Sequence, residues 1–455
     1  MRTIFLSIFA IGLFALPGVA QSDLGVHFMR GVWQANYTNP ALLPDHKVIV
    51  SVPGLKNQFS LENFSYNDLI GTNDDGQTVL QIDRVLELLD DENVVREELD
   101  VPTVAVAVRI GEGILVQAGH RLRVDALVNY PRELPSLLWK GNAQFIGEEV
   151  EIGPDLAAQS YQEFFLGAAL PIGEFLTLGA RFKYLRGTSS LETSRTDLRL
   201  LTSDDVYQSI LMADYQVNST GILEYNGFND NQFTIPDNPF ASITGNNGIA
   251  LDLGAVTTMG PVTITASVLD LGYINWTEEV ENQTLSGTFE YKGLDILDQT
   301  LTDSIDIGSI TDTLEALYDI QTTNADFRTA LPTRFFLSAS YQMSRNLQLG
   351  GLLYGELYRG QFFPAVAASL NWDATNFFSL GGVYSARRES ILNVGLHTAI
   401  RLGPVQIVAA TDNILTAFQP GDSQTAHLRL GVNLGFGYIN PDNRSNWNRE
   451  ESFFK

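Results

Sequence analysis

Apolar residues recur at every second position in many stretches of the sequence, and this alternation constrains the fold more than any other feature. In Leu428–Phe436, for example, Leu, Leu, Val, Leu and Phe alternate with Arg, Gly, Asn and Gly. Leu176–Tyr184, Val262–Val268 and Leu347–Leu357 repeat the pattern. Successive side chains of a strand point to opposite faces of the sheet. Each stretch therefore predicts a strand with one apolar face and one face of polar or small residues.

Three features of these strands favour a membrane barrel over a soluble β-sandwich. The stretches have about ten residues, the length that crosses a bilayer when a strand is tilted. Their apolar faces end in aromatic residues, at Tyr184, Tyr341, Trp372 and Tyr438, which is typical of interfacial girdles. Their other faces carry Arg, Gln, Asn and Gly, which fits a wet or plugged lumen. We expect an all-β chain that forms a single antiparallel transmembrane β-barrel of about fourteen strands, with short internal or loop helices.

The two ends of the chain have a different character from the strands. Arg2, the apolar run Ile4–Leu16 and the small residues Gly18–Ala20 have the layout of a cleaved secretory signal peptide; an uncleaved anchor is the alternative. We therefore expect three parts: a signal peptide over 1–20, an outer-membrane barrel over 21–438 and a C-terminal tail over 439–455. A secreted barrel of this kind belongs in the outer membrane, with lipid as its surroundings.

Two segments show helical periodicity instead. Gln81–Asp100 contains Ile82, Val85, Leu86 and Leu89 on one stripe, together with eight acidic and two basic residues. Pro131–Lys140 has a similar, shorter stripe. We expect the first helix to dock as an acidic plug against the inner wall of the barrel; a helix on the outer rim is the alternative.

Turns and long polar stretches separate the strands. Met259–Pro261 and Leu402–Pro404 have the composition of tight turns and are expected at the periplasmic end. The two longest polar stretches, about Thr202–Asn247 and Thr277–Ala330, are rich in Asp, Asn, Thr and Gly. They are expected as long polar insertions outside the barrel or folded into it.

Basic residues lie on the faces of the strands that are not apolar, and few acids share these faces, such as Asp125 and Glu356. Two interpretations remain open. Either a basic lumen attracts an anionic head group, or an acidic plug neutralises a basic wall; we favour the plug, because buried like charges need partners. The candidate lumen-facing residues are Arg109, Arg121, Arg123, Arg181, Lys183, Arg334, Arg401 and Arg429.

Catalytic and metal-binding patterns are weak throughout. The chain has no Cys, and its five His residues show no zinc-ligand spacing. Ser423 with His427 suggests an esterase pair, but Gln419–Asp422 has turn composition and the sequence has no nucleophile elbow. The net charge of −25 opposes binding to nucleic acid. We expect no enzyme activity, no cofactor and no metal site.

Several motifs carry a family resemblance. Trp33–Leu42 resembles the Asn-Pro-Ala segment of Bacteroidota-type outer-membrane barrels and of the long-chain fatty acid transporter superfamily. Gly141–Gly147 and Leu331–Arg334 resemble a Bacteroidota barrel family of unknown function. Gly403–Leu415 and Leu428–Gly437 are similar to that family and to barrel proteins of gliding and type IX secretion. The resemblance covers most of the mature chain, but its motifs are short.

These resemblances imply two different functions. The first is passive uptake of a hydrophobic or amphipathic small molecule. The second is a scaffold that partners a protein of a secretion or cell-surface complex. Neither requires catalytic residues, and fold alone does not choose between them.

Overall fold

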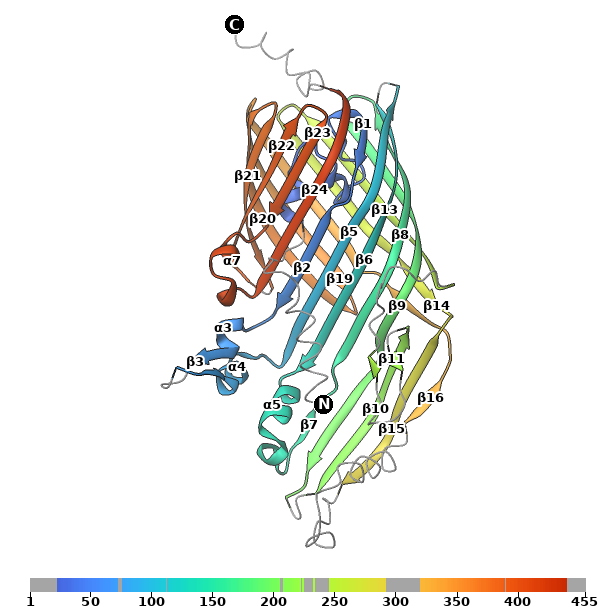
Figure 1. Cartoon of the computed structure of the whole chain (residues 1–455), viewed down its shortest axis with the longest axis vertical. Helices are drawn as coiled ribbons and strands as arrows, with labels where there is room; N and C mark the ends of the chain where they lie inside the picture. The colour runs from blue at the N-terminus through green and yellow to red at the C-terminus, as the bar shows by residue number, and fades with distance from the viewer. Residues whose placement is uncertain are drawn as a thin grey trace.

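A closed antiparallel β-barrel forms the body of the molecule (Figure 1). The computed structural model describes residues 23–72, 76–111, 113–204, 208–221, 223–224, 232–233, 245–291, 320–388 and 390–439. Within these residues, fourteen strands close the barrel when β1 and β2 count as one interrupted strand, because β24 pairs with both. The predicted fold class is therefore confirmed. The expected signal peptide and all but the first residue of the expected C-terminal tail lie outside the described residues.

The barrel strands follow one another around the wall in nearly sequential order. They are β1 (His46–Ser51), β2 (Leu55–Leu61), β5 (Glu92–Ile110), β6 (Ile114–Pro131), β8 (Asp155–Ile172), β9 (Leu176–Thr202), β13 (Asn247–Met259), β14 (Val262–Trp276), β18 (Thr333–Ser344), β19 (Leu347–Tyr358), β20 (Gln361–Thr375), β21 (Phe378–Arg387), β22 (Asn393–Leu402), β23 (Val405–Thr411) and β24 (Thr425–Tyr438).

Alternation along the strands places the apolar side chains on the outside of the barrel. On β19 and β20, Leu353, Val366 and Leu370 are each about half exposed, whereas the side chains between them are buried. An apolar outer surface and a polar interior invert the arrangement of a soluble protein. This is the architecture of an outer-membrane β-barrel.

The two ends of the barrel differ. Among the described residues, six short connections join strands at one end; they follow β5, β8, β13, β18, β20 and β22. Short turns mark the periplasmic end of bacterial barrels, and the turns predicted at Gly260 and Gly403 are among them. Among the described residues, no helix is both long enough and apolar enough to cross a membrane.

The opposite, extracellular end carries the additional elements. These are α3 (Tyr66–Leu69), β3 (Ile70–Thr72), β4 (Thr78–Leu80), α4 (Ile82–Leu88), α5 (Glu133–Lys140), η2 (Asn142–Phe145), β7 (Glu149–Glu151), β10 (Ser209–Thr220), β11 (Leu223–Glu224), β12 (Gln232–Phe233), β15 (Val280–Tyr291), β16 (Gln321–Thr323), β17 (Phe327–Ala330), α7 (Leu415–Phe418) and η4 (Pro420–Asp422).

A sheet extends the barrel wall on one side of this end (Figure 1). The second half of β9 leaves the barrel and pairs with β10, which pairs with β15, which pairs with β16. We call the second half of β9, together with β10, β15 and β16, the extracellular sheet. The two long polar insertions, expected outside the barrel or folded into it, thus contribute β10 and β15 to a sheet beyond the barrel. β10 pairs with the long β9 and β15 pairs with β10, and composition does not reveal these partners.

The predicted acidic helix over Gln81–Asp100 is also wrong in extent and place. Helix α4 ends at Leu88, and β5 begins at Glu92 and pairs with β6 along its whole length. The apolar stripe of α4 packs on Phe64 and Leu69 in a small core at the extracellular end. The helix therefore lies outside the lumen, and the acidic residues of 92–100 belong to the barrel wall.

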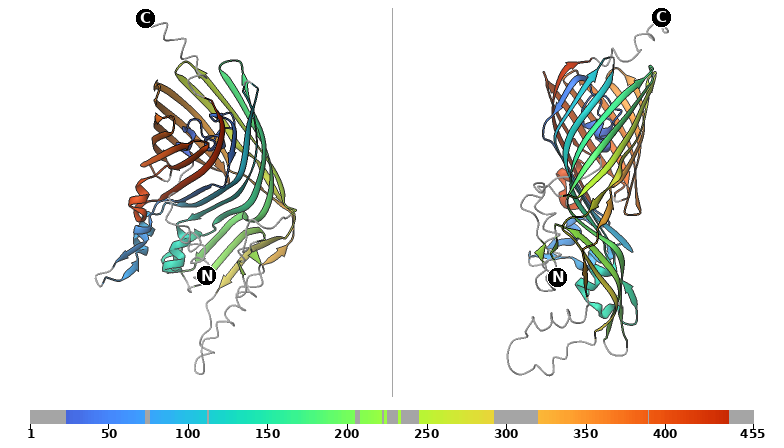
Figure 2. Two further views of the ribbon diagram at one scale, coloured as in Figure 1. Left: turned by 45° about the horizontal axis from the view of Figure 1, so that its top comes forward. Right: turned by 90° about the vertical axis from the view of Figure 1, so that its right-hand side faces the viewer.

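Residues 23–45, which we call the N-terminal segment, occupy the lumen instead (Figures 1 and 2). The segment includes α2 (Leu24–His27) and η1 (Gln34–Tyr37). Its side chains enter three apolar clusters on the inner wall, around Phe28, Trp33 and Val26. A plug is present, but it comes from the start of the described chain.

Candidate functional site inside the barrel

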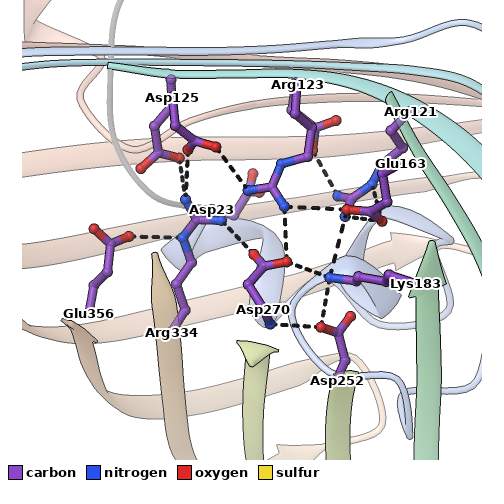
Figure 3. A network of polar contacts seen from close by, with 12 residues as sticks. Asp23, Arg121, Arg123, Asp125, Glu163, Lys183, Asp252, Asp270, Arg334 and Glu356 are labelled. Atoms are coloured by element: carbon purple, nitrogen blue, oxygen red, sulfur yellow. Dashed lines mark hydrogen bonds and ion pairs between the residues drawn. The ribbon is translucent and has the colours of Figure 1, made fainter. Parts of the chain in front are cut away.

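A connected network of ion pairs crosses the lumen beside the N-terminal segment (Figure 3). All its members but Asp23 project inward from the strands, and all have side chains that are at most 10% exposed. The network balances eight bases against eight acids. These are Lys56, Arg96, Arg121, Arg123, Arg181, Lys183, Arg334 and Arg429, with Asp23, Glu98, Asp100, Asp125, Glu163, Asp252, Asp270 and Glu356.

Cross-strand register creates many of the pairs. Arg121 of β6 lies opposite Glu163 of β8, and its Nη2 is 2.5 Å from Oε1 of that carboxylate. Arg181 of β9 lies opposite Asp252 of β13, with Nη1 and Oδ2 at 3.2 Å. Opposite charges on directly facing residues stabilise a strand pair. In a buried setting they also supply the partners that each charge needs.

Two residues connect these pairs across the lumen. The guanidinium of Arg334 lies within 3.4 Å of four carboxylates, those of Glu98, Asp125, Asp270 and Glu356. Asp270 has a φ of 60° at an irregularity of β14, and its carboxylate accepts from Arg123 at 2.9 Å. The same carboxylate lies 2.6 Å from Nζ of Lys183 and 3.1 Å from Arg334.

Asp23 is the one member of the network that does not come from a strand. Its carboxylate accepts two hydrogen bonds from Arg429 of β24, at 2.6 and 2.8 Å. Without Asp23, the wall has eight bases against seven acids. The N-terminal segment therefore completes the charge balance of the network.

The ring of Tyr37 strengthens the same attachment. Three guanidinium groups lie near it, those of Arg121 at 4.9 Å, Arg429 at 5.3 Å and Arg181 at 5.8 Å from the ring centroid. The indole of Trp33 donates to the Tyr37 hydroxyl at 3.0 Å. A desolvated cation beside an aromatic face is attracted by the ring quadrupole.

The turn at Asn39–Ala41 fits against two wall glycines. The Asn39 amide donates to the carbonyl oxygens of Ala255 and Ala266, at 3.2 and 3.1 Å, and so joins β13 to β14. A Cβ on Gly254 would lie 2.1 Å from the Asn39 amide oxygen, and one on Gly179 would lie 2.4 Å from the Ala41 nitrogen. The Asn-Pro-Ala motif thus requires a wall without side chains at these points.

A family model for a "Family of unknown function (DUF5723)" matches residues 40–412. The chain belongs to this family. Comparison with curated proteins gave no match.

Several solved barrels resemble this DUF5723 member at low identity. A FadL homologue of Pseudomonas aeruginosa is 11% identical with a TM-score of 0.44, over 92% of this chain and 99% of that one. The toluene transporter TbuX of Ralstonia pickettii is 11% identical with a TM-score of 0.42, over 93% and 100%. The toluene transporter TodX of Pseudomonas putida is 9% identical with a TM-score of 0.41, over 92% and 95%.

In the structure of the DUF5723 barrel, the eight basic residues identified from the sequence fall into two groups. Six belong to the network: Arg121, Arg123, Arg181, Lys183, Arg334 and Arg429. Arg109 and Arg401 do not; their guanidinium groups donate to backbone oxygens of the N-terminal segment, those of Pro44 at 2.8 Å and Arg30 at 3.3 Å.

Lys56, Arg96 and most of the acids were missed. Arg96, Glu98 and Asp100 alternate along β5, a signal that the helical interpretation of this stretch concealed. The view that few acids share the inner faces is wrong, because Glu163, Asp252 and others stand opposite the bases.

Two small cavities lie among the described residues of the lumen. They have volumes of about 20 and 30 Å³, room for about one or two waters each. The second lies beside Asp23 and Tyr37.

Among the described residues, no group of three or more His, Asp or Glu side chains could hold a metal ion. His427 is buried and lies 3.5 Å from Asp23, while the Ser423 hydroxyl donates to Gln419.

Proposed function

We propose that the protein resides in the outer membrane and passes a small amphipathic molecule only when the N-terminal segment leaves its docked position. The main support for this proposal is that the segment lies in the lumen without being a strand of the wall. Side chains and a few hydrogen bonds hold it in place. It can therefore move without opening a ladder of strand hydrogen bonds, which is the condition for a gate in a closed barrel.

The charges of the wall favour a substrate with an anionic head group. When Asp23 withdraws, the ion-pair network keeps eight bases against seven acids. A pure hydrocarbon would leave Arg429 without its nearest carboxylate, and an imperfectly paired buried ion costs several kcal/mol. An anionic amphiphile supplies the missing charge.

A reversible crosslink tests the gate. The side-chain amides of Gln34 and Asn433 hydrogen-bond to each other at 3.1 and 2.9 Å. The chain has no Cys, so Gln34→Cys with Asn433→Cys gives a unique pair of thiols. A short crosslinker with two thiol-reactive groups and a reducible centre can join them. We expect proteoliposomes to take up a fluorescent fatty acid only after reduction.

A crosslink within the wall is the matched control. Thr258 and Thr263 face each other across a periplasmic hairpin, with hydroxyls 3.2 Å apart. Thr258→Cys with Thr263→Cys, treated in the same way, should not change uptake. Equal uptake by the locked and reduced Gln34/Asn433 variant would contradict the gate, and no uptake in either state would contradict passage itself.

A second candidate function is that of a scaffold at the cell surface. It is supported by the extracellular sheet, which lines no part of the lumen and exposes charged pairs such as Arg195–Asp214 and Arg199–Glu149, at 2.6 and 2.7 Å. A polar sheet beyond the membrane, outside the lumen, offers a surface to a protein partner rather than a path for a small molecule.

Co-purification tests the scaffold. A partner retained at fixed stoichiometry by the native protein, and lost on Arg195→Glu with Arg199→Glu, would support this function. The barrel of that variant should keep its β-type circular dichroism and its heat-modifiable gel shift. Absence of a fixed partner, together with reduction-dependent uptake, would leave passage as the function.

A further inference from the structure

Four exposed apolar side chains gather on the outer side of the barrel at the extracellular end of β22. Ile391 and Leu392 precede this strand and are 75% and 60% exposed. Leu415 and Phe418 of α7 are 40% and 77% exposed. Figures 1 and 2 agree that α7 stands outside the wall rather than over the lumen. We call these four residues the apolar foot.

Two hydrogen bonds bring the halves of the foot together. The Ile414 N–H donates to the Val394 carbonyl at 2.7 Å, which ties the start of α7 to β22. The Tyr384 hydroxyl donates to the Ile391 carbonyl at 2.8 Å, which fixes the loop that carries Ile391 and Leu392. Both halves are therefore anchored to the outer wall at one height.

The rotation of α7 is fixed as well. The buried Thr416 hydroxyl donates to the Thr425 carbonyl at 3.1 Å, so the Thr416 side of the short helix faces the barrel. Below it, the Asn67 amide of α3 donates to Asp422 at 2.6 Å and braces the loop from the extracellular side. Leu415 and Phe418, three positions apart, remain directed away from these contacts.

The foot continues the lipid-facing surface of the barrel. Val394 and Leu396 of β22 are 39% and 41% exposed, and the foot lies directly beyond them. Neither Ser390–Leu392 nor Leu415–Pro420 contains a charged residue, although the chain as a whole has a net charge of −25. An uncharged apolar surface that continues a lipid-facing belt fits lipid better than water or an acidic neighbour.

Strand length gives the reason for such an extension. β22 has 10 residues and β23 has 7, whereas β8 and β9 on the other side have 18 and 27. A strand needs about 9–11 residues to cross a bilayer. The wall at β23 is therefore too short to cover the hydrocarbon by itself, and such a mismatch is otherwise met by tilting or by thinning the bilayer.

We propose that the apolar foot inserts into the boundary between head groups and acyl chains of the outer leaflet and sets the depth and tilt of the barrel. Amphipathic surfaces that lie in this boundary bury their apolar side chains to a shallow depth. The foot completes the belt where the wall is shortest. The inference requires a membrane location, which is part of the proposed function, but no transport activity.

Depth-dependent quenching tests the foot in the full-length protein. Phe418→Cys carries a nitrobenzoxadiazole fluorophore in phosphatidylcholine vesicles that contain lipid with a nitroxide either near the head group or deep in the acyl chain. We expect a blue-shifted emission and stronger loss of fluorescence with the shallow nitroxide. The same label at Leu80, which is 57% exposed on β4 beyond the membrane, should lose little with either.

A label at Leu353 of β19, on the outer face of the barrel wall, distinguishes failure of the inference about the foot from failure of the membrane location. If Leu353 is quenched and Phe418 behaves like Leu80, the foot lies outside the membrane and the inference is wrong. If Leu353 also escapes quenching, the membrane location itself fails. As a second measurement, Leu415→Ser with Phe418→Ser should shift a label at Val394 toward the shallow nitroxide, and an unchanged profile would overturn the role in depth.

Discussion

Replacement of Asp23 by Asn should release the N-terminal segment without unfolding the barrel. The substitution removes the only acid that the segment contributes to the network and leaves Arg429 with a single, more distant carboxylate, that of Asp100 at 3.8 Å. Breaking a buried ion pair costs about 3–5 kcal/mol. Because Asn keeps one hydrogen-bond acceptor, we expect about 3 kcal/mol, which is roughly a 100-fold rise in the undocked population.

Thiol labelling measures this population. Ala35 of the segment is 3% exposed, and the chain has no other Cys to react. The rate at which a maleimide modifies Ala35→Cys should therefore follow the fraction of undocked segment. We expect about a 100-fold faster reaction with Asp23→Asn, with an unchanged gel shift of the folded barrel.

Two further variants make the result specific. Removal of the partner as well, in Asp23→Asn with Arg429→Gln, restores a balance of seven bases and seven acids, so labelling should be slower than with Asp23→Asn alone. Charge reversal at Glu87, Asp90 and Asp91, beside α4 at the extracellular end, should leave labelling unchanged. Unchanged labelling in Asp23→Asn, or an equal rise in the α4 variant, would refute the reasoning.

Three other outcomes are expected from the same contacts. Arg334→Gln removes one basic partner from each of four buried carboxylates and should cost about 3–5 kcal/mol, seen as a lower midpoint of heat-modifiability on a gel. Arg401→Gln, which loses a contact to a backbone oxygen, should stay within about 0.5 kcal/mol, and equal midpoints for the two variants would contradict the ranking. Gly254→Ala places a Cβ 2.1 Å from the Asn39 amide oxygen and should accelerate labelling of Ala35→Cys. Gly351→Ala meets open space and should leave labelling unchanged. If neither variant changes the labelling rate, the close fit of the Asn39 turn is wrong. Raising NaCl to about 1 M should leave labelling of the otherwise native protein nearly unchanged, because buried pairs are screened little, and a strong salt dependence would mean that the network is solvated.

The sequence by itself determined the barrel. Alternation over Leu428–Phe436 and similar stretches fixes which side chains face outward, because the period of a strand is two. The turns at Gly260 and Gly403 are equally local, since Gly at a positive φ of 57° or 59° suits a tight turn. Six of the eight basic residues identified from their faces do meet in the network. Local periodicity suffices for all of these.

Only the tertiary structure decided what those faces meet. Residues 92–100 look helical and acidic along the chain, but pairing with β6 makes them a strand, and Glu98 then reaches Arg334 of a strand far away in sequence. Asp23, in a segment with no strand pattern, supplies the last charge of the lumen. Periodicity indicates which face of the sheet a side chain points to. The partner of that side chain depends on strand register and on closure of the barrel, which are set by contacts between distant strands.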